Sequence, residues 1–241
     1  MKLIEFIDPV ECKCIKRPSV VIKSPYVADI LINNKEMLAH CPSLGLGNII
    51  QPDSIMLATK SNTKTKTDYT IQAVLEDNVW VGNVPLHANR IVKNLLENTN
   101  HIMENIKHIK PEFKYGDSRF DFLINLNNDE CIYCEVKSVH IKQNNTAIFP
   151  VGYIKPKQNT VSERANKHLT ELISLAKENK KAMLIFVVQR GDCDKFSPNL
   201  QKDPIFSGLL HSALQNNVII KIIYTYVDTK GIYFRYIEDY K

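Results

Sequence analysis

Residues 119–138 contain two carboxylates, Asp121 and Glu135, and a lysine, Lys137, whose types and spacing could perform chemistry. Asp121 stands fourteen positions before Glu135, and Lys137 follows Glu135 after a single residue. The polar residues 127–130 separate two apolar runs, a pattern that predicts two short strands joined by a turn. Carboxylates held close together repel each other, so one takes up a proton unless a cation lies between them. Asp121 and Glu135 are therefore candidate ligands of a hard divalent ion, Mg²⁺ or Mn²⁺.

The apolar residues of these two strands predict how the strands pair. Most of them are even-numbered: Phe120, Phe122, Ile124 and Leu126 in the first, and Ile132, Cys134 and Val136 in the second. Because side chains alternate between the faces of a strand, pairing that buries both sets together fixes the register. That register requires a loop of odd length or a bulge, and it places Asp121, Glu135 and Lys137 on one face.

The lysine suggests catalysis in addition to metal binding. A lysine beside a metal can orient or help to deprotonate a water molecule, or offset charge that develops on a phosphate. The spacing D-x13-E-x-K resembles the PD-(D/E)XK signature of the restriction-endonuclease-like nucleases. An E-x-K pair on an edge strand is also a common solvated feature, so the pattern leaves a non-catalytic interpretation of Asp121, Glu135 and Lys137 open.

Length and composition set the broad class of the protein. A chain of 241 residues is long enough for two domains. Its 44% hydrophobic and 24% charged content is ordinary for a globular protein. No apolar run approaches the length of a membrane span, and residues 1–6 lack the apolar stretch of a secretory signal. We therefore expect no membrane partner and a cytoplasmic location, nucleoid-associated if the source is bacterial. The net charge of +5 is a mild indication of polyanion binding.

The six cysteines do not complete a metal site. Cys131 and Cys134 form a C-x-x-C pair, but their side chains are expected on opposite faces of a strand. No second pair and no nearby histidine pair accompanies them. The expected state is therefore reduced, structural thiols.

Residues 1–83 contain short β-type runs separated by turn residues. The candidate strands are residues 3–7, 20–23, 27–32, 36–39, 54–59, 70–75 and 79–82. Short strands at this spacing favour a small barrel, and an OB-like barrel that binds single strands is one possibility. The loop before the sixth run carries Lys60, Lys64, Lys66 and Tyr69, which could contact phosphates and stack a base. A solvated hairpin tip is the alternative interpretation.

Residues 40–47 form a turn-rich segment whose glycines would let the backbone approach a ligand. The segment matches neither the phosphate-binding P-loop pattern nor the dinucleotide-binding glycine pattern. We therefore expect a structural turn that caps the barrel.

A second domain is expected at residues 84–241, because the apolar period changes there from strand-like to helical. Helical stripes lie near residues 91–96 and 206–214, and the continuous apolar run 182–188 suits a strand covered on both faces. Further strands are expected at 112–115, 218–226 and 232–237. The order of these elements predicts a mixed α/β sandwich.

Ser162 is expected to cap the helix that lies opposite the acidic hairpin. The core face of this helix is formed by Ala165, Leu169, Leu172, Ile173 and Ala176. Arg164 and His168, four residues apart, share another face of its first turns.

The chain also contains a series of short motifs in a defined order. They are His40-Cys41-Pro42, Val81-Gly82, Asn89-Arg90, Lys114-Tyr115-Gly116, Ser118-Arg119-x-Asp121-Phe122, Glu135-Val136-Lys137-Ser138, Phe149-Pro150, Glu163-Arg164-x-x-Lys167-His168-Leu169 and Phe186-Val187-Val188-Gln189-Arg190. Together these motifs resemble the sugar fermentation stimulation protein A (SfsA) family, and their order and spacing agree almost throughout the chain.

The resemblance implies an α/β protein with an N-terminal OB-like β-barrel, followed by a restriction-endonuclease-like PD-(D/E)XK domain that is associated with DNA. By position, Asp121, Glu135 and Lys137 match the nuclease signature of this domain. Arg164 and Lys167 match a helix that should stand across from the signature. With Arg119, they are candidate nucleic-acid-binding residues.

Three positions depart from the family pattern. Val151 stands where an aspartate usually follows Phe-Pro, before an apparent ten-residue insertion. Ala165 replaces a glycine after the helix arginine, which favours a firmer helix. Leu44 replaces a threonine in the N-terminal turn, so a hydroxyl contact is lost there. The signature carboxylates are retained.

The sequence therefore predicts a DNA-binding protein with a Mg²⁺- or Mn²⁺-dependent phosphodiesterase site. The alternative is a non-catalytic DNA-binding or regulatory protein built on an inactive nuclease scaffold, because fold does not guarantee activity. The form of the substrate, its sequence preference and the oligomeric state do not follow from the sequence.

Overall fold

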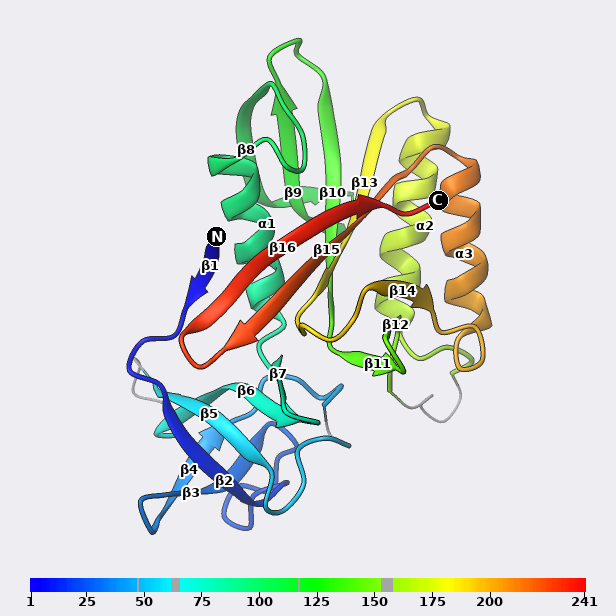
Figure 1. Cartoon of the computed structure of the whole chain (residues 1–241). Helices are drawn as coiled ribbons and strands as arrows, with labels where there is room; N and C mark the ends of the chain where they lie inside the picture. The colour runs from blue at the N-terminus through cyan, green and yellow to red at the C-terminus, as the bar shows by residue number, and fades with distance from the viewer. Residues whose placement is uncertain (47, 62–65, 117, 153–157) are drawn as a thin grey trace.

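The computed structural model describes residues 1–46, 48–61, 66–116, 118–152 and 158–241. It is a mixed α/β structure in which a small β-barrel lies below a larger, helix-covered sheet (Figure 1). The five barrel strands are β2 (Val10–Lys16), β3 (Val27–Ile32), β4 (Lys35–His40), β5 (Ile55–Lys60) and β6 (Tyr69–Glu76). They pair in the order β4-β3-β2-β5-β6, and parallel pairing of β4 with β6 closes the barrel. The predicted small barrel is thus confirmed.

The strand predicted at residues 20–23 is wrong, because side chains hold this segment in bends. Ser19 Oγ accepts hydrogen bonds from the backbone N–H groups of Val21 and Ile22, both at 3.1 Å. Asp29 accepts one from the N–H of Val20 at 2.8 Å. Such local bonds compete with strand pairing, and they leave the two valines exposed.

Two strands near the N-terminus differ from the sequence prediction. β2 was not predicted, because Glu11 and Lys13 interrupt its apolar pattern, although Cys12 and Cys14 lie in the barrel core. β1 (Lys2–Glu5) lies outside the barrel, since it pairs with β16 (Gly231–Asp239) near the other end of the chain. The first strand therefore belongs to the larger sheet.

The larger sheet continues from the barrel through β7 (Val79–Gly82). Its order is β7, β15 (Ile219–Asp228), β13 (Lys181–Val188), β10 (Cys131–Val139), β9 (Ser118–Leu126) and β8 (Ile106–Tyr115). The central strands β10, β13 and β15 are parallel. A separate small sheet is formed by β11 (Ile141–Gln143), β12 (Thr146–Phe149) and β14 (Lys195–Pro198).

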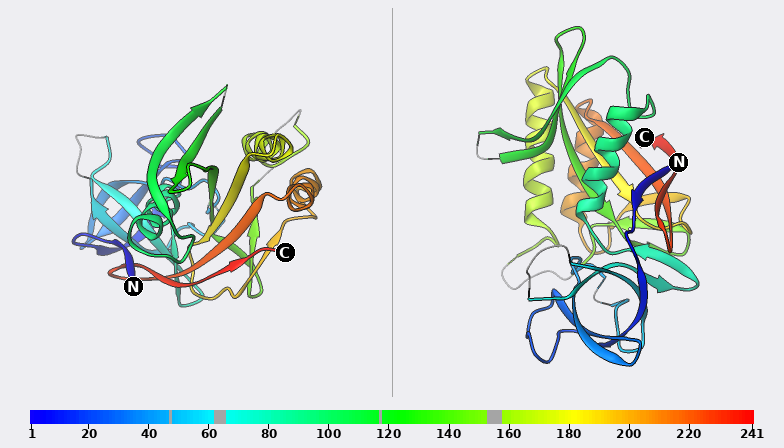
Figure 2. Two further views of the ribbon diagram at one scale, coloured as in Figure 1. Left: turned by 90° about the horizontal axis from the view of Figure 1, so that it is seen from above. Right: turned by 90° about the vertical axis from the view of Figure 1, so that its left-hand side faces the viewer.

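Helices cover both faces of the large sheet (Figure 2). On one face α1 (Leu86–Asn98) packs against a core that includes Ile185 and Val187 of β13. On the other face α2 (Glu163–Lys177) and α3 (Pro204–Gln215) pack against Leu184 and Phe186. This alternation confirms the prediction that the apolar run 182–188 is a strand buried on both faces. As predicted, Ser162 caps α2 by accepting a hydrogen bond from the N–H of Ala165 at 3.2 Å.

The hairpin of β9 and β10 has the predicted register for most of its length. Ile132 pairs with Ile124 and Cys134 with Phe122, and residues 127–129 form the odd-length loop between the strands. Phe122, Ile124, Ile132, Cys134 and Val136 lie in the core beneath α1. The prediction for Phe120 is wrong, because its ring lies in the core on the α2 side. Phe120 and Phe122, two residues apart, therefore lie in the cores on opposite sides of the sheet.

A buried ionic cluster joins the barrel to the sheet. The guanidinium of Arg190 is fully buried and donates to both carboxylate oxygens of Asp192, at 2.6 and 2.8 Å. It also donates to the carbonyl oxygen of His140 at 3.0 Å and lies 2.8 Å from a carboxylate oxygen of Glu76 in β6. Lys142 forms a further ion pair with Asp192 at 2.5 Å. This cluster fixes the end of β6 against the larger sheet.

All six cysteines carry free thiols, as predicted. None of the helices in the described part of the chain is long and apolar enough to cross a membrane.

Candidate functional site

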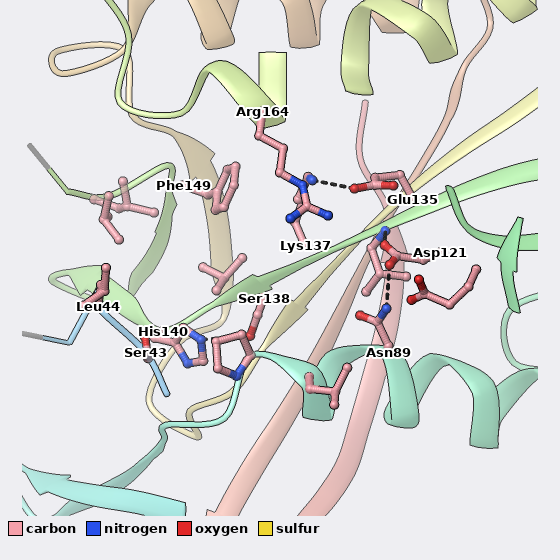
Figure 3. A pocket seen from close by; sticks show the side chains of 18 residues that line it. Ser43, Leu44, Asn89, Asp121, Glu135, Lys137, Ser138, His140, Phe149 and Arg164 are labelled. Carbon is pink, nitrogen blue, oxygen red and sulfur yellow. Dashed lines mark hydrogen bonds and ion pairs between the residues drawn. The ribbon is translucent and has the colours of Figure 1, made fainter. Parts of the chain in front are cut away.

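A pocket of about 500 Å³ lies where the barrel meets the larger sheet. Asp121, Glu135 and Lys137 line it together, from the adjacent strands β9 and β10 (Figure 3). Asn89 of α1 and Arg164 of α2 complete its polar wall. The structure therefore brings the three predicted catalytic residues to one cavity.

Asp121 occupies the point at which β9 and β10 separate. The two strands pair regularly as far as Phe122 and Cys134, and the backbone N–H of Val136 then donates to the carboxylate of Asp121 at 2.8 Å. The amide of Asn89 donates to the other carboxylate oxygen at 2.6 Å. Burial, together with the negative charge of Glu135, raises the pKa of Asp121 to about 6. Two hydrogen bonds thus fix the orientation of the carboxylate, while burial and the charge of Glu135 disfavour its ionised form.

Glu135 is buried, and its two carboxylate oxygens have different surroundings. Oε1 accepts from the ammonium of Lys137 at 2.6 Å and also contacts Nδ1 of His168. Oε2 is buried and has no hydrogen-bond partner among the described residues. Burial acts to raise the pKa of Glu135, but the His168 hydrogen bond and the Lys137 charge outweigh it and leave this pKa below its usual value. One oxygen of an ionised, buried carboxylate is therefore available to a ligand.

Two cations approach the acidic pair from different elements. Lys137 is largely buried beside Glu135. Arg164 extends from the first turn of α2 toward the pocket (Figure 3), and it forms no ion pair with any residue that the structure describes. This arginine is free to contact an anion in the pocket.

His168 is a site residue that the sequence did not identify. It was expected only to share a helix face with Arg164, but it is buried and lies against Glu135 and the ring of Phe120. The signal in the sequence was the four-residue spacing, which places both basic side chains above the same hairpin. The contact between His168 and Glu135 could not be predicted from this spacing, because it depends on how α2 packs against β10.

The donor set fits a hard divalent cation. Burying a carboxylate oxygen without a partner costs free energy of folding. A cation beside Oε2 of Glu135 would offset this cost and would also lower the pKa of Asp121. No group of three or more histidine, cysteine, aspartate or glutamate side chains in the described ranges is placed to hold a metal ion by itself. Two carboxylates without further protein ligands match Mg²⁺, which keeps several waters and binds through one or two carboxylates.

Comparison with known proteins relates the whole chain to one group. Residues 86–231 match the family described as "Sugar fermentation stimulation protein RE domain". A sugar fermentation stimulation protein homolog of Crocosphaera subtropica is 31% identical over 225 residues, which are 90% of this chain and 90% of the relative. A homolog of Geotalea daltonii is 33% identical over 208 residues, 83% of this chain and 86% of the relative. The chain belongs to the sugar fermentation stimulation protein (SfsA) family.

A solved SfsA structure has the same overall architecture. SfsA of Pyrococcus furiosus, in complex with Ca²⁺, superposes with a TM-score of 0.83 at 25% sequence identity. The match covers 98% of this chain and 96% of that protein. The family relationship therefore extends over the barrel as well as the larger sheet.

The other candidate nucleic-acid-binding residues of this SfsA-family chain are dispersed. Lys60 and Tyr69 line a second pocket of about 510 Å³, with Arg90 of α1. Lys66 is exposed and lines neither pocket, and Lys64 lies outside the described residues. Among the members of the predicted binding set that the structure describes, only Arg164 lines the acidic pocket.

Two further candidates lie on the exposed surface. Arg119 forms an ion pair with Glu112 at 2.9 Å, and Lys167 lies 3.9 Å from Glu171. Neither side chain lines the acidic pocket, although Glu112 does. Any contact of Arg119 or Lys167 with nucleic acid would therefore be peripheral.

The barrel contributes a turn that was expected to be only structural. Ser43, Leu44 and Gly45, which follow β4, line the acidic pocket. A Cβ atom on Gly45 would lie 3.6 Å from the side chain of Val151, which lines the same pocket. Two of the three positions that depart from the family pattern, Leu44 and Val151, thus lie at one edge of the site.

Proposed function

We propose that this SfsA-family protein is a metal-dependent nuclease that hydrolyses phosphodiester bonds of DNA. The observation that carries the proposal is the free, buried Oε2 of Glu135 in a pocket that also contains Asp121, Lys137 and Arg164. A buried carboxylate oxygen without a partner lowers the stability of the fold, and a bound ion or water would offset that cost. Its neighbours provide a second acidic ligand for a cation and two positive charges for a phosphate.

The arrangement of the strands supports a PD-(D/E)XK domain. The acidic residues lie on two antiparallel neighbours, β9 and β10, and β10 is followed in the sheet by the parallel strands β13 and β15. A helix, α2, connects β10 with β13 and places Arg164 and His168 over the hairpin. The closed five-stranded barrel likewise supports an OB-like first domain.

Each residue of the pocket has a defined role in this proposal. Asp121 and Oε2 of Glu135 would hold Mg²⁺ or Mn²⁺, which when bound supplies charge neutralisation on the phosphate and a more acidic water. Asn89 fixes the orientation of Asp121 by its hydrogen bond. His168 holds Oε1 of Glu135, so that Oε2 keeps its direction when Lys137 turns to a substrate.

The two cations of the pocket act on the phosphate. Lys137 positions the attacking water or offsets negative charge that develops on the phosphoryl oxygens. Arg164 has two-pronged donor geometry for phosphate oxygens and would fix the orientation of the strand. The Ca²⁺ bound by P. furiosus SfsA supports the use of a hard divalent ion in this family.

The second candidate function is DNA binding without catalysis. It is favoured by the ion pair between Lys137 and Glu135 at 2.6 Å, which neutralises the carboxylate without a metal. In that case the cluster is an inherited structural feature, and Lys60, Lys66 and Tyr69 of the barrel would account for binding.

Cleavage assays with matched variants test the choice between the two functions. Single- and double-stranded DNA and RNA are incubated with Mg²⁺ or Mn²⁺ and wild type, Glu135→Gln or Glu130→Gln. Glu130 lies on the same hairpin but is exposed and paired with Lys181. The nuclease predicts metal-dependent cleavage that only Glu135→Gln abolishes. Absence of cleavage by the wild type under all conditions would establish the non-catalytic function.

A further inference from the structure

The pocket that contains the acidic cluster also has an apolar wall. Leu44 of the barrel turn, Leu86 at the start of α1 and Phe149 at the end of β12 line it. Leu44 and Leu86 expose 49% and 56% of their surface, which is unusual for large apolar side chains. Leu44 belongs to the barrel, and Leu86 belongs to the helix that covers one face of the larger sheet. The apolar wall therefore spans both parts of the molecule.

Phe149 is held rigidly in this wall. Its ring packs against Phe206 at a centroid distance of 5.1 Å and against Phe186 at 5.5 Å, both in the core beneath α2 and α3. Its remaining surface lines the pocket beside Arg164 (Figure 3). A supported aromatic ring next to an arginine can stack a base while the guanidinium contacts the adjoining phosphate.

The size of the pocket limits what can enter it. A volume of about 500 Å³ is typical of sites that enclose one small molecule. A phosphate bound at Asp121, Glu135 and Lys137 would leave room for one neighbouring nucleoside against the apolar wall. An intact base pair presents its flat faces to its neighbours in the stack, so it offers no surface to these side chains.

We infer that the site accepts DNA in which the nucleotide next to the cleaved bond is unpaired, as in a single strand or an overhang. This inference rests on the proposed nuclease function and adds the form of its substrate. An unpaired base can contact Leu44, Leu86 and Phe149 without any base pair being broken. In a duplex, the free energy of pairing and stacking at that nucleotide must first be lost. The exposed leucines are then covered when substrate binds.

The test uses one fluorescent DNA sequence in three forms: a single strand, a blunt duplex and a duplex with an overhang. Cleavage is measured with Mn²⁺, and binding is measured by anisotropy with the Glu135→Gln protein. We expect the single strand and the overhang to be cleaved and bound at least about tenfold better than the blunt duplex. The double variant Leu44→Ser/Leu86→Ser should lose most of this preference, and Leu200→Ser, a 65% exposed leucine outside the pocket, should retain it.

The outcomes separate this inference from the nuclease proposal. Equal affinity for the single strand and the blunt duplex overturns the inference, whether or not cleavage occurs. An unchanged preference in a folded Leu44→Ser/Leu86→Ser protein also overturns it. If no form is cleaved but the single strand is bound preferentially and the leucines are required, the nuclease function fails and the inferred specificity of the pocket is retained.

Discussion

Arg190 and Glu135 are both buried charged residues, but the charges around them are balanced differently. Arg190 is paired with Asp192 and Glu76, and Lys142 adds a second cation to Asp192. Glu135 is paired through one oxygen only, while its other oxygen has no partner among the described residues. Glu76 Oε2 also lacks a hydrogen bond, but it lies 2.8 Å from the Arg190 guanidinium, so the charges of the first cluster are balanced within the protein. The Glu135 cluster is unsaturated, because Oε2 of Glu135 has neither a hydrogen bond nor an ion pair among the described residues.

Asp192 and Asp121, one carboxylate from each cluster, differ in the direction of their pKa shifts. Burial acts to raise the pKa of Asp192, but hydrogen bonds from Arg190 and Lys142 outweigh it and lower the value to about 2. Burial and the neighbouring Glu135 raise the pKa of Asp121 to about 6. Asp192 is therefore held ionised by two cations of the protein, whereas Asp121 forms no ion pair with the residues that the structure describes.

The largest effect on stability is expected for Arg190→Met. The change leaves Asp192 and Glu76 without their buried partner, which typically costs about 3 kcal/mol or more. Urea denaturation measures the free energy of unfolding. Glu135→Gln, which removes a charge from the unsaturated cluster, should change this free energy by less than about 1 kcal/mol. Equal destabilisation by both variants would remove the distinction between the clusters.

The largest effect on activity without loss of fold is expected for Lys137→Ala. If the lysine acts on the water or the developing charge, the cleavage rate falls about a hundredfold or more. DNA affinity should change only a few-fold, because the loss removes at most about one phosphate contact. Single-turnover cleavage and anisotropy are measured on the same preparation. A loss of rate and affinity by the same factor would make Lys137 a binding residue only.

The two shifted aspartates predict opposite dependences of stability on pH. The folded pKa of Asp121 exceeds its ordinary value of 3.8, so the folded state retains a proton that the unfolded chain loses. The contribution of Asp121 to the free energy of unfolding should therefore fall between about pH 4 and pH 6, by on the order of 2–3 kcal/mol, whereas the lowered pKa values of the buried His87 and His140 act to raise the total over the same range. Asp192, whose pKa is lowered, contributes stability above about pH 4 that is lost as the pH falls toward 2.

Metal-free denaturation of wild type and Asp121→Asn between pH 4 and pH 7 checks the first of these windows. The amide that replaces the carboxylate in this variant does not ionise, and the contributions of His87 and His140 cancel in the difference between the two proteins. The stability of wild type minus that of Asp121→Asn should therefore fall between pH 4 and pH 6. Asp129→Asn, at an exposed loop position, is the control. A difference between wild type and Asp121→Asn that stays constant or rises over this window would contradict the assignment.

A smaller effect is expected for His168, which acts through Glu135. Partners of metal ligands typically change metal affinity about ten- to a hundredfold. His168→Ala should therefore weaken Mn²⁺ binding by about this factor, and His168→Gln should recover part of it by donating to Oε1. Titration of bound Mn²⁺ by electron paramagnetic resonance gives the affinity independently of cleavage. Equal Mn²⁺ affinities of His168→Ala and wild type would exclude this positioning role.

Local patterns in the sequence predicted most of the larger sheet. The parity of apolar residues predicted that Asp121 and Glu135 converge, and the helical stripe after Ser162 predicted α2. Phe120 was assigned to the wrong face, because its ring contacts Tyr133 and His168 on the α2 side of the sheet. A local period contains no information on such a contact.

Residues whose role depends on distant contacts were not predicted. The contact of His168 with Glu135 joins positions far apart in the sequence, and so do the contacts of Arg190 with Glu76 of β6 and with the carbonyl oxygen of His140. The position of Leu44 at the pocket depends on how the barrel docks on the sheet. The sequence therefore predicted that the acidic pair would lie together, but not the residues that contact this pair or the apolar wall of the pocket.

The smallest effect compares the barrel loop with the pocket. Lys60 and Lys66 are exposed and lie far along the chain from Lys137, and the triple variant Lys60→Ala/Lys64→Ala/Lys66→Ala removes three charges of this loop. Each lost phosphate contact lowers the slope of log affinity against log salt by about 0.7 for a single strand and about 0.9 for a duplex. If the loop lies on the binding face, the triple variant should flatten the slope by about two, while Lys137→Ala changes it by at most about one.

Replacement of the exposed Lys177, Lys195 and Lys202, which line neither pocket, corrects for net charge. If both triple variants give the same slope, the barrel loop is an ordinary solvated hairpin tip, and DNA binding depends on the pocket.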